Sequence, residues 1–305
     1  MAAPSLVLPE VAKRRAIVRA AENRRSTRLV LGSSNSARTL AMILLIVMAV
    51  IWLTPFVWAF ITSFKTEVDA AMAATLVPED GWTLQAYVQV LTQGALPLWM
   101  LNSTIVAVLV TVITVTISAM AGYAFSQTLF RGRAILFAIT VASIMVPAQI
   151  LIVPLFQQMQ MFRMVDTFAG IVLPQVVAPV MVFILKKFFD GIPQELIDAA
   201  RVDGAGPWRT FATVVLPLSR SILVAVAIFV FIGAWNNFLW PFIVTTDASL
   251  MTIPVGLATV EEAYGLQYAR VMASAMIAAL PLLIVFMFFQ RQIVRGVATT
   301  GMGGQ

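Results

Sequence analysis

The chain of 305 residues contains no cysteine and no histidine. Without cysteine it can form no disulfide and no thiolate site. Without histidine it lacks a frequent metal ligand and the side chain best suited to acid–base catalysis near neutral pH. The sequence also has no G-x-x-x-x-G-K-S/T phosphate-binding loop, so we expect no ATP or Mg site in this chain. These absences exclude most catalytic sites and indicate a protein that is not an enzyme.

Charged residues are scarce as well. Only 11% of the chain is Asp, Glu, Lys or Arg and 60% is hydrophobic, whereas about 25% of a soluble domain is charged. A soluble protein of this size would need a charged shell to cover its core in water. The composition therefore indicates a membrane protein. The net charge of +6 would also suit nucleic-acid binding, and the positions of Lys and Arg decide between the two.

Six apolar segments approach or exceed the roughly 20 helical residues that a bilayer requires, and none contains Asp, Glu, Lys or Arg. They run approximately Thr39–Thr62, Trp99–Gln127, Ala134–Phe156, Phe168–Leu185, Ser221–Thr245 and Val271–Phe289. We predict an all-α polytopic membrane protein of about six transmembrane helices. Its parts are a basic N-terminal arm (residues 1–38), a six-helix transmembrane domain (39–294) and a C-terminal tail (295–305).

The basic residues alternate between the two sides of the membrane. Of the 20 Lys and Arg residues, 17 lie in the arm and in the segments after the second, fourth and sixth spans. The other three are Lys65, Arg163 and Arg270. The positive-inside rule then places both termini in the cytoplasm, together with the loop 186–220. This asymmetry accounts for the net charge without a nucleic-acid partner.

The first apolar segment could also be read as a signal peptide, because Ala71-Met72-Ala73 resembles a cleavage site. However, the segment is longer than the roughly 7–15 residues of a signal's apolar region, and a long basic arm precedes it. We therefore favour an uncleaved span. The arm is expected to determine topology and to contact anionic lipid. Its basic residues include Lys13, Arg14, Arg15, Arg24 and Arg25.

Prolines lie within or at the edge of several spans. They are Pro55, Pro147, Pro154, Pro174, Pro179, Pro241 and Pro281. Helix breaks in lipid are tolerated where neighbouring helices or cavity water satisfy the freed backbone groups. Such breaks suit a transporter better than a passive anchor.

The loop 186–220 is the longest connection predicted in the cytoplasm and mixes both charge signs. Pro193 suits the first turn of a helix, and Glu195 favours its N-terminal end. Gly204 is expected to end this helix. An apolar face is expected from Leu196, Ala199, Ala200 and Val202. The pattern predicts a short helix outside the membrane that another surface can approach closely, although an ordinary solvated loop helix would explain it too.

The same loop carries a long gapped motif. Asp198-Ala199-Ala200 is followed after three residues by Gly204, and after nine more by Val214-Val215-Leu216-Pro217. This run resembles the Glu-Ala-Ala loop of the permease subunits of ATP-binding-cassette (ABC) importers. Asp198 stands where that pattern has Glu, which keeps the charge on a shorter side chain.

The resemblance extends over most of the chain after the arm. It is to the permeases for carbohydrates and related compounds, in particular the smaller partner in maltose-type and glycerol-3-phosphate-type importers. It is carried by Asn102-Ser103, Tyr123-Ala124-Phe125, Phe130-Arg131-Gly132, the run from Trp235 to Pro241, Gln290-Arg291 and Arg295-Gly296. The resemblance implies uptake of a sugar, polyol or glycerol-phosphate compound across the inner or plasma membrane of a prokaryote. Implied partners are a second permease subunit, two ATPase subunits that bind ATP and Mg, and an extracellular binding protein.

The resemblance also implies that the loop helix docks on an ATPase subunit. The residues expected in this coupling are Glu195, Asp198, Ala199, Ala200, Asp203, Gly204, Leu216 and Pro217. The carboxylates would pair with basic groups, the alanines would pack closely, and Leu216 and Pro217 would set the return into the fifth span. The tail 295–305 would reach the ATPase interface, unless it is simply a frayed terminus.

Polar side chains inside the spans are candidates for the translocation pathway. They are Asn102, Gln149, Gln175, Trp235, Asn236 and Asn237. Hydrogen bonding between helices would explain each of them equally well. The absence of charge within the spans argues against a proton-coupled carrier. A secondary carrier or channel, and a membrane-embedded enzyme, are the rival hypotheses, and the loop motif disfavours both.

Overall fold

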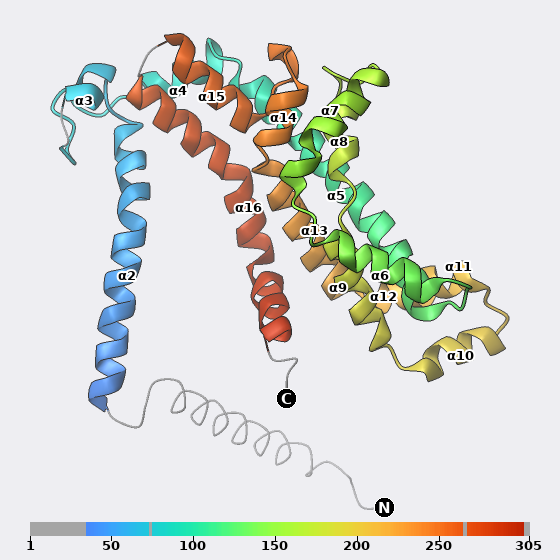
Figure 1. Ribbon diagram of the computed structural model, residues 1–305. Helices are drawn as coiled ribbons and strands as arrows, with labels where there is room; N and C mark the ends of the chain where they lie inside the picture. The colour runs from blue at the N-terminus through green and yellow to red at the C-terminus, as the bar shows by residue number, and fades with distance from the viewer. Residues whose placement is uncertain (1–34, 73–74, 265–266, 302–305) are drawn as a thin grey trace, which may run out of the picture. The chain divides into compact units, whose positions relative to one another are not determined.

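The computed structural model describes residues 35–72, 75–264 and 267–301. Its ordered elements within these ranges are all helices, so the all-α prediction is confirmed (Figure 1). The predictions for the basic arm before residue 35 and for residues 302–305 fall outside the described residues. In chain order the helices are α2 (Asn35–Thr62), α3 (Glu67–Met72), α4 (Gln85–Thr92), α5 (Leu96–Gln127), α6 (Arg133–Ser143), η1 (Ala148–Leu151), α7 (Ile152–Met161), α8 (Phe168–Val172), η2 (Leu173–Gln175), α9 (Pro179–Asp190), α10 (Gln194–Val202), α11 (Pro207–Thr210), η3 (Phe211–Val215), α12 (Leu216–Leu218), α13 (Arg220–Trp235), α14 (Leu239–Val244), η4 (Ala248–Leu250), α15 (Ile253–Tyr264) and α16 (Tyr268–Gly301).

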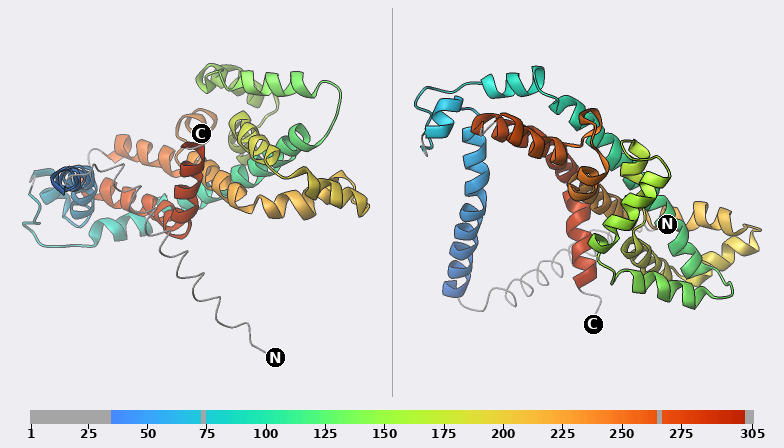
Figure 2. Two further views of the ribbon diagram at one scale, coloured as in Figure 1. Left: turned by 90° about the horizontal axis from the view of Figure 1, so that it is seen from below. Right: turned by 45° about the horizontal axis from the view of Figure 1, so that its top comes forward.

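The chain divides into two compact units, residues 1–61 and 62–305. The first contains nearly all of α2, an apolar helix long enough to cross a membrane. The second contains α3 to α16 and a hydrophobic core that joins α5, α9 and α13. Within this second unit, α10 lies at one end, and α4 and α15 lie at the other (Figures 1 and 2).

Half of the predicted spans are bent. Among the described residues, α2, α5 and α16 are single helices that could cross a membrane. Three further spans are bent pairs: α6 meets η1–α7 at 94°, α8–η2 meets α9 at 48°, and the segment Pro207–Leu218 meets α13 at 81°. If each pair is one span, the number reaches the six predicted.

Three of the predicted spans are interrupted, and two of the interruptions lie at prolines singled out in the sequence. The breaks fall around Pro147 in the predicted span Ala134–Phe156, before Pro179 in Phe168–Leu185, and after Trp235 in Ser221–Thr245. Proline lacks a backbone N–H and pushes the preceding residue out of the helical region, so the first two breaks have a direct cause in the sequence. The third leaves Asn236 and Asn237 between α13 and α14.

The long helix α5 binds segments that are distant in sequence through its polar side chains. Near its start, Asn102 Nδ2 donates to the backbone oxygens of Ser249 (2.8 Å) and Met251 (3.0 Å). Ser103 Oγ accepts a hydrogen bond from the backbone N–H of Ile253 at 2.8 Å. Asn102 and Ser103 are both buried. These bonds attach η4 and the first turn of α15 to α5, because backbone groups outside regular helix need partners where water is absent.

Farther along, α5 makes the same kind of bond to one of the helix breaks and to the start of α11. Thr114 Oγ1 donates to the backbone oxygen of Val176 at 3.2 Å, in the break between η2 and α9. Tyr123 Oη donates to the backbone oxygen of Pro207 at 3.0 Å, where α11 begins. One straight helix therefore holds several interrupted ones.

The segment between α2 and α5 contains a buried ion pair that the sequence did not reveal. Lys65 and Asp69 are 2% and 4% exposed, and Lys65 Nζ lies 3.4 Å from Asp69 Oδ1. Lys65 Nζ also donates to the backbone oxygen of Thr75 at 2.8 Å. Nearby, the Glu67 carboxylate accepts hydrogen bonds from the first-turn backbone N–H groups of α16, including that of Arg270 at 2.9 Å. The carboxylate at this N-terminus complements the helix dipole and joins α3 to α16.

Close packing of α15 on α5 gives a test of the fold. A Cβ added at Gly256 would overlap the ring of Trp99, whereas one added at Gly233 in α13 would meet no atom within 4 Å. We expect Gly256→Ala to destabilise the protein by about 1–3 kcal/mol through overpacking. Thermal denaturation in detergent measures this, with Gly233→Ala as the control expected to retain the wild-type melting temperature. Equal melting temperatures for the two variants would contradict the packing of α15 on α5.

Candidate functional site

The predicted loop helix is present as α10. It begins directly after Pro193, whose backbone is extended (φ −54°, ψ 129°), and runs from Gln194 to Val202. Gly204 follows with φ +77°, in the left-handed region. The N–H of Ala205 then bonds to the backbone oxygen of Ala200 at 2.9 Å. Glycine adopts this conformation at low cost, so Gly204 ends the helix as the sequence predicted.

The exposed side of α10 includes two of the apolar residues predicted for it, since Leu196 and Val202 are 44% and 88% exposed. Ile197, which was not among the predicted residues, is completely buried and anchors the helix to the core. A short helix buries only the narrow face toward its own core, so its remaining apolar side chains stay available to another surface.

Most residues predicted for ATPase coupling lie on the outer surface of this loop. Glu195, Asp198, Ala199, Asp203 and Gly204 are exposed, and Ala200 is half-buried. Asp198 Oδ1 accepts hydrogen bonds within the helix from Arg201 Nη1 (3.0 Å) and Gln194 Nε2 (3.2 Å). An ion pair this exposed contributes no more than about 1 kcal/mol, so Asp198 can exchange these partners for a basic group on another protein at little cost.

The end of the loop forms the bend into α13. The chain passes from the π-helical turn η3 through Leu216 and Pro217, and the axis then turns by 81°. Leu216 packs against the core, whereas Pro217 is exposed. Ser219 N–H closes the turn on the backbone oxygen of Val215 at 3.0 Å. Pro217 lacks an N–H and cannot continue regular helical bonding, which fits the structural role predicted for this pair.

The loop is attached to the C-terminal end of α5 by side chains that include Tyr123 and Gln127. The Tyr123 hydroxyl holds Pro207, and the Tyr123 and Phe211 rings lie 5.0 Å apart between centroids. Gln127 Nε2 donates to the backbone oxygen of Phe189 at 2.6 Å, which fixes the end of α9. A displacement of the loop therefore pulls directly on α5.

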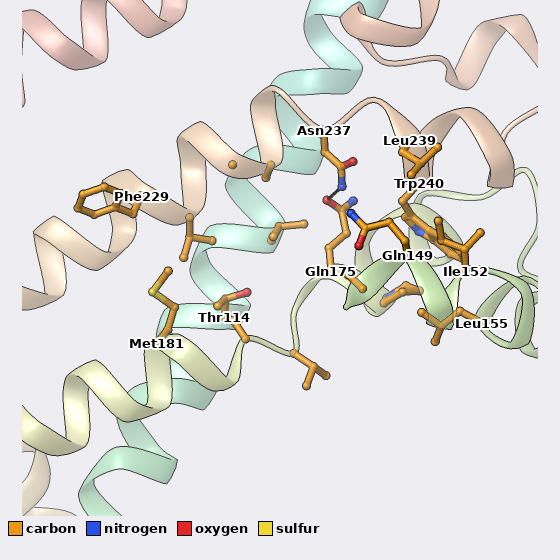
Figure 3. Close-up of a pocket in the computed structure, with 18 residues that line it drawn as sticks. Thr114, Gln149, Ile152, Leu155, Gln175, Met181, Phe229, Asn237, Leu239 and Trp240 are labelled. Carbon is orange, nitrogen blue, oxygen red and sulfur yellow. Dashed lines mark hydrogen bonds between the residues drawn. The ribbon is translucent and has the colours of Figure 1, made fainter. Parts of the chain in front are cut away.

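A cavity of about 470 Å³ lies among α5, α7, α9, α13 and α14. Three of the predicted pathway residues line it, namely Gln149, Gln175 and Asn237. Figure 3 shows their side chains gathered in one region of the cavity, near Trp240. All three come from helix breaks or 3-10 turns, which expose polar groups that a regular helix would direct elsewhere. Half of the six residues predicted for the pathway therefore line one cavity.

The amides in the cavity are partly linked to one another. Asn237 Nδ2 donates to Gln175 Oε1 at 2.7 Å, and Gln175 Nε2 donates to the backbone oxygen of Ile171 at 2.7 Å. This chain of bonds ties the break after α13 to the break before α9. Trp240, outside the predicted set, also lines the cavity, and its indole N–H donates to the backbone oxygen of Gly170 at 3.1 Å. The sequence feature that could have identified Trp240 is its position in the run from Trp235 to Pro241, which carries part of the family resemblance.

The other three predicted pathway residues lie outside this cavity. Asn102 is buried and bonded to the segment 249–251, as described above. Trp235 is buried in a separate apolar cluster and stacks on Phe231, with centroids 5.8 Å apart. Asn236 is exposed and donates to the backbone oxygen of Ile232 at 2.9 Å. The contacts of Asn102 match the hydrogen bonding between helices that was the alternative explanation for such residues, whereas Asn236 bonds within its own helix.

The loops beside the cavity are joined by Asp166. Its carboxylate accepts hydrogen bonds from the Thr246 hydroxyl (2.6 Å) and from the backbone N–H of Asp247 (2.9 Å), while its own N–H donates to the oxygen of Val244 (3.0 Å). These bonds, that of the Thr246 hydroxyl above all, hold the pKa of Asp166 below its ordinary value. The clamp fixes the end of α14, which supplies Trp240 to the cavity wall.

No group of three or more acidic side chains that could hold a metal occurs in the described part of the chain. We therefore assign no residue to a metal, and the expectation that this chain carries no cofactor stays a prediction. The arrangement offers two features instead: an exposed helix that another protein can approach, and a mostly apolar cavity with three amide side chains in its wall.

Comparison with known proteins agrees with this arrangement. The family model described as binding-protein-dependent transport system inner membrane component matches residues 115–299. The chain is 36% identical to the arabinooligosaccharides transport system permease protein of Halalkalibacterium halodurans, over 73% of this chain and 80% of the relative. It is also 36% identical to the trehalose/maltose transport system permease protein of Thermococcus litoralis, over 88% of this chain and 98% of the relative.

The chain is also similar to one further relative and to one solved structure. The chain is 34% identical to the sn-glycerol-3-phosphate transport system permease protein of Yersinia pestis, over 65% of this chain and 72% of the relative. The fold is similar to a chain of a bacterial ABC transporter involved in the import of the acidic polysaccharide alginate, with a TM-score of 0.78 and 20% identity, covering 85% of this chain and 98% of the other.

The Asp166 clamp gives a pH-dependent prediction. Because its pKa is lowered in the folded state, its stabilisation is fully present above the ordinary Asp value of about 3.9 and is lost as pH falls through the lower folded-state pKa. We expect Asp166→Asn to lower the melting temperature at neutral pH, by an effect of about 1 kcal/mol or less after solvent screening. Melting in detergent from pH 7 to below pH 4 measures this, and the gap between wild type and variant should narrow as the pH falls.

Asp203→Asn is the matched control, because the Asp203 side chain accepts no hydrogen bond among the described residues. A gap that stays constant with pH, or one equally large for Asp203→Asn, would contradict the clamp.

Proposed function

The chain belongs to the family of binding-protein-dependent transport system inner membrane components, and from this membership we propose that it carries a sugar or a related polyol or glycerol-phosphate compound into the cytoplasm. As a permease subunit of an ABC importer it is a non-catalytic, multi-pass membrane component. The support for the cargo class comes from the relatives, whose names specify arabinooligosaccharides, diacetylchitobiose, trehalose/maltose and sn-glycerol-3-phosphate.

The proposed complex contains a second permease subunit, two ATPase subunits and an extracellular substrate-binding protein. The ATPase subunits would bind ATP and Mg, since this sequence has no phosphate-binding loop. The family description itself specifies dependence on a binding protein. Both termini and the α10 loop are proposed to face the cytoplasm, because 17 of the 20 Lys and Arg residues lie on that side.

The single observation that carries the coupling proposal is the exposure of α10. Its core side is fixed by Ile197, and its outer side presents carboxylates, small residues and exposed Leu196 and Val202. A groove on an ATPase subunit with basic groups at its rim would complement this surface.

Motion of α10 can reach the cavity through α5. The loop is bonded to α5 at Tyr123, and the same helix supplies Val110 and Thr114 to the cavity wall. Transport requires two arrangements of the bundle that nucleotide binding favours to different extents. The packed and hydrogen-bonded path from Pro207 to Thr114 is the route along which α10 would shift the cavity between them.

The left-handed conformation of Gly204 gives the test. A β-branched residue fits poorly at φ +77°, so Gly204→Val should distort the end of α10, abolish uptake and weaken association with the ATPase subunits, while membrane insertion stays intact. Gly206→Val is the matched control, since Gly206 has φ −70° and no atom lies within 4 Å of a Cβ placed there.

The measurements are ATP-dependent uptake by vesicles and recovery of ATPase subunits with the tagged permease. Wild-type uptake and recovery in Gly204→Val would overturn the coupling role of this loop.

A further inference from the structure

The cavity is lined without any ionisable side chain. Its 18 lining residues include none of Asp, Glu, Lys or Arg, and its polar side chains are those of Thr114, Gln149, Gln175, Asn237 and Trp240. A phosphate or carboxylate that entered would lose hydration and meet no cation of this subunit, which is costly in a space with mostly apolar walls. The lining therefore disfavours charged cargo and suits a neutral compound with hydroxyl groups.

The amides keep hydrogen-bonding capacity that the protein does not use. Among the described residues, Gln149 makes no side-chain hydrogen bond, and Asn237 uses one N–H of its amide and not its oxygen. An amide both donates and accepts, so it matches a hydroxyl, which does the same. Polar groups that point into a cavity without a protein partner are available to a ligand or to water.

The size and the walls fit a sugar as well. A volume of about 470 Å³ lies within the roughly 300–1,000 Å³ of small-molecule sites. Phe229 and Trp240 contribute aromatic surface, against which the C–H face of a sugar ring can pack. The amides come from three separate breaks in the helices, and discontinuous membrane helices form substrate sites in other transporters.

We propose that this cavity binds a neutral saccharide in transit, so that this subunit contacts cargo through Gln149, Gln175 and Asn237. The inference rests on the proposed importer function and narrows it, because it selects neutral sugars over glycerol phosphates and acidic saccharides. Gln175 and Asn237 also hold two helix breaks together, since they bond to each other. Gln149 makes no such bond, so a substitution at Gln149 tests cargo binding without removing a bond that supports the fold.

The absence of cysteine makes a direct occupancy test possible, since a single introduced thiol is unique in this chain. Two variants of the complex are compared, one with Gln149→Cys and one with Gln157→Cys. Each complex is purified through a tag on this subunit and reconstituted with its binding protein. Gln157 is exposed on the same helical segment and does not line the cavity. The rate at which a small methanethiosulfonate reagent labels the thiol is measured with ATP, both without a probe and with one of four probes. The probes are maltose, trehalose, diacetylchitobiose and glycerol 3-phosphate.

We expect a transported neutral sugar to slow labelling of Gln149→Cys and to leave that of Gln157→Cys unchanged. Equal labelling rates with and without a sugar that the complex transports would overturn the inference. Uptake of glycerol 3-phosphate without uptake of any neutral sugar would also overturn it, while the proposed importer function would stand. Amino-acid uptake is measured with the same complex, and uptake of amino acids alone would overturn the proposed function as well.

Uptake by conservative variants gives an independent readout. Loss of one uncharged hydrogen bond to cargo should lower neutral-sugar uptake by Gln149→Leu about three- to tenfold, and Gln149→Asn should recover part of it. Gln157→Leu should transport at the wild-type rate. Unaltered uptake by Gln149→Leu would contradict a cargo contact at this position.

Discussion

Membrane hydrocarbon contains no water that could bond to a backbone carbonyl at a helix break. This protein interrupts three of its spans, so it has to supply those bonds from side chains. The continuous helix α5 provides one of them, because Thr114 bonds to the break before α9. The same helix also holds two segments away from those breaks, since Asn102 bonds to the segment before α15 and Tyr123 bonds to the start of α11. Several interrupted segments therefore depend on this one unbroken helix for their placement.

The same bonds connect the two ends of the functional unit. Tyr123 holds the loop that carries α10, and Thr114, on the same helix, lines the cavity. A polar side chain that bonds to the backbone of a neighbouring segment therefore also links the movement of the two segments. The breaks themselves carry Gln149, Gln175 and Asn237, which concentrates neutral hydrogen-bonding groups where the regular helices end. The proposed coupling and the proposed cargo contact thus both depend on polar side chains that lie along α5 and at the helix breaks.

Local patterns in the sequence predicted a large part of this structure. Span number followed from segment length, and the end of α10 followed from Gly204, whose left-handed φ of +77° depends mainly on its own residue type. What depends on distant partners was not predictable. The role of Asn102 is set by oxygens 147 and 149 residues away in the chain. The choice of Ile197 over Leu196 as the buried side chain of α10 is set by the core beneath it, and the burial of Lys65, whose Nζ donates to the backbone oxygen of Thr75, depends on how the segment around it folds back.

The central claim is that the outer face of α10 is the surface on which the ATPase subunits act. Val202 is 88% exposed on that face, and the chain has no other thiol to compete with one placed there. The direct measurement is photo-cross-linking from Val202→Cys, labelled with a short photoreactive group in the intact membrane complex, followed by identification of the linked chain. The account predicts a cross-link to an ATPase subunit, whereas cross-links only to the second permease subunit or to lipid would contradict it.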